Sequence, residues 1–381
     1  MRVELFTPDH VPAVKAYNRR LAAAGVGWRF PEDPVPTWLP RTEHSPVFQE
    51  YLLLTDGEHV RGAYALKHQE ASVRGKLVRV GCSYWMISEG TINKAYALVA
   101  RRLLQDAMRR EPLLFAVGME GGDSPIVRLL RASGWRLSGI PFYFKVINGT
   151  RFLREIRYLR STQFRRWVFD LAAISGAGWV GARLSSRLLT RRPRRTRPAT
   201  AEIAEEFGAW TDELWRECKD RYSFHGVRDS AALNQVFPRG KPEFTRLKIA
   251  TEDGGVGLAV LKDATDPGHE NFGDMRVGTI ADCLARPEHA DEVILASTAV
   301  LEQKGVDLII SNQSHPAWGN ALRRAGFLAG PSTFLFATSD RLTDLLARDD
   351  PELRDIHVNR GDGDYPWGVS LKVSAGGGTR V

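Results

Sequence analysis

Residues 275–338 read MRVGTIADCLARPEHADEVILASTAVLEQKGVDLIISNQSHPAWGNALRRAGFLAGPSTFLFAT, and this stretch decides the fold. Leu308-Ile309-Ile310 is an apolar run typical of a buried strand, and apolar residues recur at helical spacing from 289 to 304. Gly305 and Gly326 each stand just past a predicted helix, where a positive φ is favoured. The pattern predicts, in order, a strand over 276–283, a helix over 289–304, a strand over 308–311, a short helix over 318–325 and a strand over 333–338.

The same order of elements occurs once more near the start of the chain. The second helix of each copy ends alike, SPIVRLLRASGW (residues 124–135) beside HPAWGNALRRAGF (residues 315–327). An internal repeat of this length predicts two domains of one architecture. The first copy is predicted as a strand over 79–87, a helix over 95–109, a strand over 114–117, a short helix over 126–132 and a strand over 142–147.

The segments upstream of each copy complete the domains. In the first, a strand over 3–6, a helix over 11–24 and a hairpin around Asp56-Gly57 surround a stretch over 25–46 that is rich in proline and aromatic residues. The second begins with a helix over 204–219 and strands over 244–250 and 257–262. The chain is therefore divided into a first domain (1–149), a connector (150–199), a second domain (200–340) and a tail (341–381) whose end is expected to be disordered.

This order of elements resembles the C-terminal half of the GNAT acyltransferase fold. The order is strand, helix, strand, short helix ending in Gly-Phe or Gly-Trp, and strand. The resemblance implies an α/β (α+β) protein of two tandem GNAT-like domains, each with a mixed, mainly antiparallel sheet flanked by helices. It also implies that the stretch over 25–46 covers an acceptor site, although a packed surface loop is the alternative. Two such domains with a basic helical segment are also similar to FemAB-type aminoacyl transferases and to lipid aminoacylating enzymes.

In the GNAT pattern the loop before the first long helix holds the pyrophosphate of CoA with backbone N–H groups. The matching segment here, residues 88–95, implies that acetyl-CoA or another acyl-CoA is the donor. The family's Arg/Gln-x-x-Gly-x-Gly/Ala motif falls on Ile92, Ala95 and Ala97, so only its last position fits. The residues expected to bind CoA are Ser88, Gly90, Asn93, Lys94 and Ala95.

The candidate catalytic residues follow the central strand of each copy. Glu120 stands where the family places acceptor or CoA contacts and is a candidate general base, with a plain loop carboxylate as the alternative. The tyrosine that the family uses as an acid is replaced by Leu130 and Leu322. His315 of the second copy is a candidate base near Asp282, and capping of the helix before Pro316 is the alternative.

The second domain lacks a conventional CoA loop. The matching segment contains no glycine, and Glu288 and Asp291 at its helix start would repel a pyrophosphate. No HxH or HxxxH pattern occurs in the chain, so we predict no metal site.

The formal net charge of +8 belongs to the connector. Residues 151–200 hold 13 arginines, no lysine and two acids, a net charge of +11 that leaves −3 for the remainder. Arginines interleaved with aromatic residues are typical of a basic amphipathic helix at a membrane surface. Three interpretations of residues 151–197 stay open: a linker packed on both domains, an anionic membrane surface as partner, and nucleic acid, which is disfavoured because no stacking or base-reading motif accompanies the charge.

Composition indicates the compartment. Cys82, Cys218 and Cys283 form no CxxC pair, which favours a reducing environment. The N-terminal residues show no apolar core of a signal peptide, and no uncharged apolar run reaches the roughly 20 residues of a membrane span. We expect a cytoplasmic protein, peripheral at the inner face of a membrane if the connector binds lipid.

The leading expectation for function is N-acyl transfer from acyl-CoA to an amine of a cell-envelope, polysaccharide (glycan) or small-molecule precursor. Two alternatives stay open. One is a non-catalytic GNAT-fold scaffold in a membrane-associated biosynthetic complex, and the other is a FemAB-like transferase that uses aminoacyl-tRNA.

Overall fold

The computed structural model describes residues 1–32, 35–43, 45–119, 122, 124–155, 198–265, 272–348 and 350–363. Its first half contains β1 (Arg2–Leu5), α1 (Val11–Ala23), β2 (Phe48–Asp56), β3 (His59–Val73), β4 (Lys76–Ser88), α2 (Val99–Arg110), β5 (Leu114–Gly118), α3 (Pro125–Ala132), β6 (Arg136–Gly139), β7 (Phe142–Val146) and α4 (Gly149–Glu155). The second half contains β8 (Thr200–Ala204), α7 (Ala209–Cys218), β9 (His225–Gly226), α8 (Ser230–Val236), β10 (Phe244–Thr251), β11 (Gly254–Thr265), β12 (Arg276–Ala285), α9 (Ala290–Gln303), β13 (Leu308–Asn312), α10 (Pro316–Arg324), β14 (Leu328–Gly330), β15 (Leu335–Thr338) and α11 (Asp340–Ala347).

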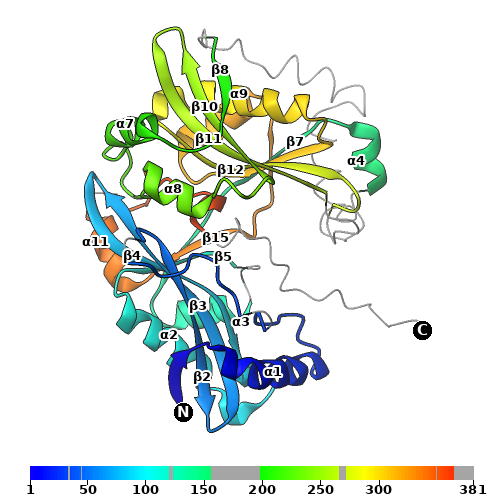
Figure 1. Ribbon diagram of the computed structural model, residues 1–381, viewed down its shortest axis with the longest axis vertical. Coiled ribbons are helices and arrows are strands. Elements are labelled where there is room, and N and C mark those ends of the chain that lie inside the picture. Colours follow the sequence, from blue (N-terminus) through cyan, green and yellow to red (C-terminus); the bar gives the residue numbers. More distant parts are fainter. Residues whose placement is uncertain are drawn as a thin grey trace.

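The strands form two mixed sheets, which lie in the lower and the upper half of Figure 1. The first sheet has the order β1-β2-β3-β4-β5-β15-β6, with β9 beside β3. The second has the order β14-β7-β13-β12-β11-β10-β8. Only β4 with β5 and β12 with β13 pair in parallel. The predicted fold class, with mainly antiparallel sheets flanked by helices, is confirmed.

The two halves exchange their last strands. Strand β7 comes from the first half but pairs with β13 and β14 of the second sheet, with Phe144 opposite both Ile310 and Leu328. Strand β15 comes from the second half but pairs with β5 and β6, with Phe336 opposite Val117 and Ser138. The chain ranges 1–149 and 200–340 therefore do not coincide with the two sheets, because each sheet is completed by a strand of the other half.

A long helix packs closely on each sheet. Helix α2 lies on β3 at Gly62, where an added Cβ would come within 2.6 Å of Val99. In the second sheet α9 lies on β11 at Gly257, where an added Cβ would collide with Val293. The missing side chain at these equivalent positions lets each helix approach its sheet, so the repeat extends to the packing of the layers.

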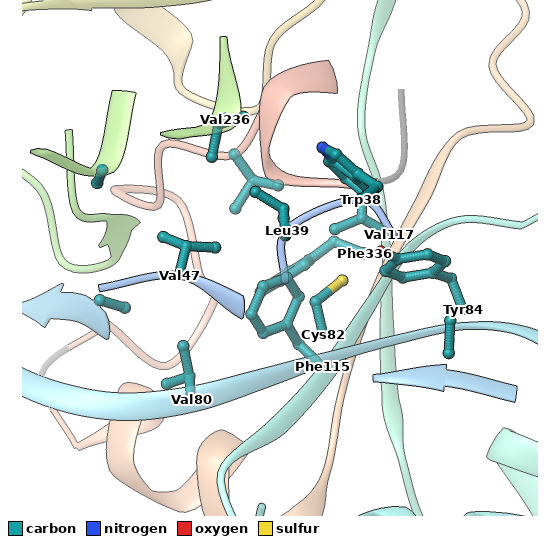
Figure 2. Close-up of a cluster of buried hydrophobic side chains, with 14 of the residues drawn as sticks. Trp38, Leu39, Val47, Val80, Cys82, Tyr84, Phe115, Val117, Val236 and Phe336 are labelled. Carbon is teal, nitrogen blue, oxygen red and sulfur yellow. The ribbon is translucent and has the colours of Figure 1, made fainter. Parts of the chain in front are cut away.

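One apolar core spans both halves. The rings of Phe115 on β5, Phe336 on β15 and Phe224 before β9 lie with centroids 5.7 to 5.9 Å apart. Figure 2 shows a part of this core where side chains from residues 38–47, β4, β5, β15 and α8 meet (Trp38, Leu39, Val47, Val80, Cys82, Phe115, Val117, Phe336 and Val236). Because the core is continuous, the two sheets form one packed body.

Some sequence predictions need correction. Strands β6, β8 and β14 were not predicted, since these short edge strands are largely exposed and show no apolar alternation. The tail was expected to lie outside the domains, yet α11 and residues 350–363 pack on them. Residues 374–381, whose disorder was predicted, lie outside the described residues.

The basic connector was predicted as an amphipathic helix. Only its beginning is described, where α4 ends at Glu155, and residues 156–197 lie outside the described residues. Within the parts of the chain that the structure describes, no helix is long and apolar enough to cross a membrane.

Candidate active site

The central parallel strands of the first sheet separate shortly after they meet. Strands β4 and β5 pair only at Gly81 with Leu114 and at Cys82 with Phe115. Beyond these pairs β4 continues to Ser88 and β5 to Gly118. We call the diverging ends, residues 83–88 and 116–118, the first splay. Ligands of open α/β sheets bind at the carboxyl ends of parallel strands, which is where this splay lies.

A β-bulge turns the backbone at the first splay. Ala65 faces Tyr84 and Ala63 faces Ile87, so that two residues, Trp85 and Met86, oppose Tyr64 alone. Trp85 adopts a φ of 54°, a region that bulky residues rarely occupy. A bulge bends its strand and increases the local twist, so β4 changes direction at the first splay.

The end of β5 is also strained. Gly118 and Met119 have φ values of 102° and 50°, and positive φ at a non-glycine residue costs of order 1–3 kcal/mol. Strained backbone clusters at functional sites, and here it flanks the splay on both strands. Glu120, the candidate base, follows directly but lies outside the described residues.

Part of the proline-rich stretch is buried in the core that also contains residues of the splay. Trp38 and Leu39 are buried in the core cluster that also holds Tyr84 and Val117, and Figure 2 shows Trp38 near these two residues. Leu39 itself has a φ of 49°. Packing in the apolar core accounts for the burial of Trp38 and Leu39, and cover of an acceptor site by this stretch stays a prediction.

The predicted CoA loop differs from a simple helix start. Asn93 caps a 3₁₀ turn over Lys94–Tyr96, in which its Oδ1 accepts a hydrogen bond from Ala95 N at 3.0 Å. Ser88 Oγ likewise accepts from Gly90 N at 3.0 Å. Helix α2 begins only at Val99, so the predicted start at residue 95 is wrong. The cause is that short polar side chains compete for backbone N–H groups and favour turns over helix.

The buried carboxylate of Glu89 attaches the loop over residues 88–95 to α1 and β3. Glu89 Oε1 accepts from Arg20 Nε of α1 at 2.8 Å, and Glu89 Oε2 accepts from Arg61 Nη1 of β3 at 3.0 Å. Burial alone would raise the pKa of Glu89, but the two arginines outweigh burial and lower it. Arg61 also lies over the ring of Tyr96, 4.3 Å from its centroid. The loop is thus fixed to the sheet, while Asn93, Lys94 and Ala95 face solvent.

Charge distinguishes the two long helices at their starts. The first turn of α2 contains no acid, and Arg101 and Arg102 are exposed there. The first turn of α9 contains Asp291 and Glu292. A helix N-terminus favours an anion, and acidic side chains in the first turn oppose one, so of these two helices α2 has the start that is more favourable to an anion.

His315 occupies a capping position in the second half. Its Nδ1 accepts a hydrogen bond from Ala317 N at 3.2 Å as the N-cap of α10, and its Nε2 lies 3.9 Å from Asp355. Burial lowers the pKa of His315, and the charges of Asp355 and Asp350 only partly offset this lowering. Helix capping accounts for the position of His315, and its role as a base stays a prediction.

Asp282, predicted near His315, belongs instead to a buried ionic cluster. Arg228 donates from Nε to Asp282 Oδ1 at 2.8 Å and from Nη2 to Asp362 Oδ2 at 2.9 Å. Asn359 Nδ2 also donates to Asp282 Oδ1 at 2.8 Å. Burial alone would lower the pKa of Arg228, but the two carboxylates outweigh it and raise it.

Sequence reasoning missed this cluster. Its members come from positions 228, 282, 359 and 362, which share no local pattern. One usable signal was Lys67, a lysine within an apolar strand, which is buried and donates to the carbonyl oxygens of Asp362 and Gly363 at 2.6 and 3.2 Å. Among the residues that the structure describes, no group of three or more His, Cys, Asp or Glu side chains is arranged to hold a metal ion.

No protein-family model matches the sequence, and no curated protein matches it. The chain is similar in structure to Saccharomyces cerevisiae N-myristoyltransferase with bound myristoyl-CoA, at 12% identity over 89% of this chain and 78% of that chain, with a TM-score of 0.52. A second structure of that enzyme, with myristoyl-CoA and inhibitors, matches at 11% identity over 89% and 79% of the two chains, with a TM-score of 0.50. A probable N-acyltransferase from Enterococcus faecalis has a TM-score of 0.47 at 9% identity over 88% and 71%.

Identities this low establish the fold and nothing finer. The strand order of each sheet, its single parallel pair and its long helix agree with the architecture that the repeat predicted. The chain therefore shares the fold of N-myristoyltransferase, and its two sheets agree with the two-unit plan that the repeat predicted.

Proposed function

We propose that this protein transfers an acyl group from acyl-CoA to an amine, and that the reaction takes place at the first splay. The observation that carries the proposal is the bulge at Trp85 and Met86 beside the diverging ends of β4 and β5. The fold supports it, because the similar structures contain bound myristoyl-CoA. The chain length of the acyl group is left to experiment, with acetyl-CoA as the first donor to try.

The chemistry needs little from the protein beyond position and charge. The neutral amine attacks the thioester carbonyl, the C–S bond breaks, and the CoA thiolate leaves and is protonated while the amide forms. We assign stabilisation of the oxyanion to a backbone N–H of the first splay. The amine's proton goes to a base, for which we propose Glu120 or a bound water.

The phosphates of CoA are assigned to the start of α2. Residues 88–95 lead into this helix, Glu89 fixes them to the sheet, and Lys94, Arg101 and Arg102 are exposed nearby. Gly90 N and Ala95 N are already paired, so the side chains and the first turn of α2 carry more of the binding than the resemblance implied.

The acceptor is proposed to be an amine of a cell-envelope, glycan or small-molecule precursor. Two other functions stay open as tests. An aminoacyl-tRNA donor would fit the likeness to FemAB-type enzymes, and a scaffold role would fit the missing tyrosine at Leu130. Both predict no measurable affinity for acyl-CoA.

Calorimetric titration with CoA, acetyl-CoA and myristoyl-CoA tests the proposal. We expect micromolar binding that Lys94→Glu weakens by about tenfold, as one lost charge contact of about 1.4 kcal/mol would produce. Lys76→Glu is the matched control, since Lys76 is an exposed lysine at the far end of β4. Once an acceptor is found, Glu120→Gln should lower kcat by at least about a hundredfold and leave CoA binding unchanged.

Absence of binding to all three ligands would reject the proposed donor. An equal loss in Lys76→Glu and Lys94→Glu would show that net charge, not a site at α2, governs affinity. Unchanged turnover in Glu120→Gln would assign the proton to water.

A further inference from the structure

The central strands of the second sheet also separate, but the space between them is filled by the chain itself. Strands β12 and β13 pair from Val277 with Leu308 to Ile280 with Ser311. Ala281 is an extra residue in the ladder between β11 and β12, since Val260 faces Asp282 and Leu261 faces Ile280. We call the ends beyond these pairs, residues 281–285 and 312–314, the second splay. Residues 356–363, which we call the plug segment, lie between them.

The plug segment is bonded to both sides of the second splay. On the side of β13, Asn359 forms an antiparallel bridge with Gln313, and Ser314 N donates to Val358 O at 3.1 Å. On the side of β12, Asn359 Nδ2 donates to Asp282 Oδ1, and an added Cβ at Gly361 would lie 2.7 Å from Asp282. The backbone of Gln313 and Ser314 is therefore already paired with the plug segment, while on the β12 side the plug segment contacts the side chain of Asp282.

Aromatic contacts fix the beginning of the plug segment. The ring of His357 is stacked against Tyr222, with centroids 4.7 Å apart, and against Trp318, with centroids 5.2 Å apart. His357 N donates to Phe224 O at 2.8 Å. These three side chains are buried, so the plug segment is part of the core and not a strand laid on its surface.

Buried charges fix its end, and they come from both halves of the chain. Arg228 binds Asp282 of β12 and Asp362 of the plug segment. Lys67 of β3, in the first sheet, donates to the carbonyl oxygens of Asp362 and Gly363. The two cations and two carboxylates balance only when the plug segment is docked on both sheets.

The two splays therefore differ. In the first, the described part of the plug segment approaches β5 at its last residue, where an added Cβ at Gly363 would lie 3.4 Å from Val117. In the second, the plug segment contacts both diverging strand ends, at Gln313 and Ser314 on one side and at Asp282 on the other.

We infer that residues 356–363 are a built-in plug of the second donor site, so that each chain binds one acyl-CoA and binds it at the first splay. This inference rests on the proposed function. The inference gives a physical reason why only one of the two sheets binds acyl-CoA. At the second splay, acyl-CoA and the plug segment would require the same space and the same backbone groups. Release of the plug would expose two carboxylates and one arginine that lose their partners.

Three readings on the full chain test the inference. The first is the calorimetric stoichiometry of acyl-CoA, expected to be one per chain. The second is the position of cross-links from an acyl-CoA with a photoreactive acyl chain, expected in peptides that contain residues 82–86 or 114–119. The third is amide hydrogen exchange without ligand, in which Ser314, His357 and Val358 should exchange as slowly as the core strands.

Matched variants address the plug directly. Gly361→Val would collide with Asp282 and is expected to speed exchange across residues 356–363 by at least tenfold. Gly255→Val, at a position where an added Cβ meets nothing within 4 Å, should leave that exchange unchanged.

Two acyl-CoA molecules per chain, or cross-links to residues 281–285 or 312–315, would overturn the inference. Fast exchange at residues 356–363 in the wild-type chain would overturn it without reference to any ligand. If no acyl-CoA binds, the proposed function fails, and slow exchange then supports the plug by itself.

Discussion

Arg228 is a fully buried guanidinium that holds together parts of the chain more than a hundred residues apart. Its partners Asp282 and Asp362 lie on β12 and in the plug segment. Burial of charged groups is costly unless each is paired and hydrogen-bonded. Here Asn359 and Cys283 N add hydrogen bonds to Asp282, so the cluster meets that condition.

Replacement of Arg228 should therefore be far more costly than loss of a surface pair. Arg228→Met leaves two carboxylates buried without their cation, and we expect the free energy of unfolding to fall by about 3–5 kcal/mol. Arg239→Met is the matched control, because Arg239 pairs with Glu205 at the exposed surface and should cost less than about 1 kcal/mol. Urea unfolding measures both. Similar losses in the two variants would contradict a specific role of the cluster.

At the scale of elements, the exchange of β7 and β15 is the feature with the widest consequence. A strand in the middle of a sheet satisfies backbone groups on both of its neighbours. Without β15 the first sheet would be split between β5 and β6, and without β7 the second would be split between β13 and β14. Neither half contains a complete sheet.

Fragments of the chain test this directly. We expect residues 1–149 alone, and residues 198–381 alone, to lack a cooperative unfolding transition, because each leaves strand edges unpaired and apolar surface exposed. Co-expressed fragments should purify as one complex that unfolds cooperatively. Circular dichroism during thermal unfolding is the measurement. A cooperative transition in fragment 1–149 by itself would show that β15 is dispensable to the first sheet.

The whole molecule should be sensitive to acid through buried histidines. Burial, and next the charge of Arg228, lower the pKa of His225 to about 3, and burial also lowers the pKa of His357 well below its usual value. Such groups are neutral when folded and gain a proton on unfolding, so their contribution is fully present above pH 6.5 and is lost as pH falls. His68 acts oppositely, because Glu111 and Glu50 outweigh burial and raise its pKa.

His357→Phe should reduce this acid sensitivity. The phenylalanine ring keeps the aromatic contacts with Tyr222 and Trp318, while one titrating group is removed. Between about pH 5 and 6.5 the slope of unfolding free energy against pH should decrease by up to about 1.4 kcal/mol per pH unit. Denaturant unfolding at several pH values measures it. A slope equal to that of the wild-type chain would mean that His357 takes up a proton in the folded protein.

Much of the architecture was predictable from local pattern. Periodicity and glycine positions indicated the long helices, the buried strands and the repeat, because helical and strand spacing are recorded within a dozen residues. Residues 88–95 and the end of β5 were identified as candidate site residues by resemblance to one family. The exact start of α2 was not predicted. A single hydrogen bond from Ala95 N to Asn93 Oδ1 favours a turn at residues 94–96 over an earlier start of the helix.

The sequence alone indicated the long helices, the buried strands and the two-unit plan of this protein, but not the short edge strands β6, β8 and β14. Only the tertiary structure decided which sheet β7 and β15 join, because both are short apolar strands whose patterns suit either sheet. It also decided that residues 356–363 fill the second splay and that Arg228, Asp282, Asp362 and Lys67 share one cluster. The physical reason is that strand pairing and buried charge balance depend on which distant segments meet in space, and no local pattern records that choice.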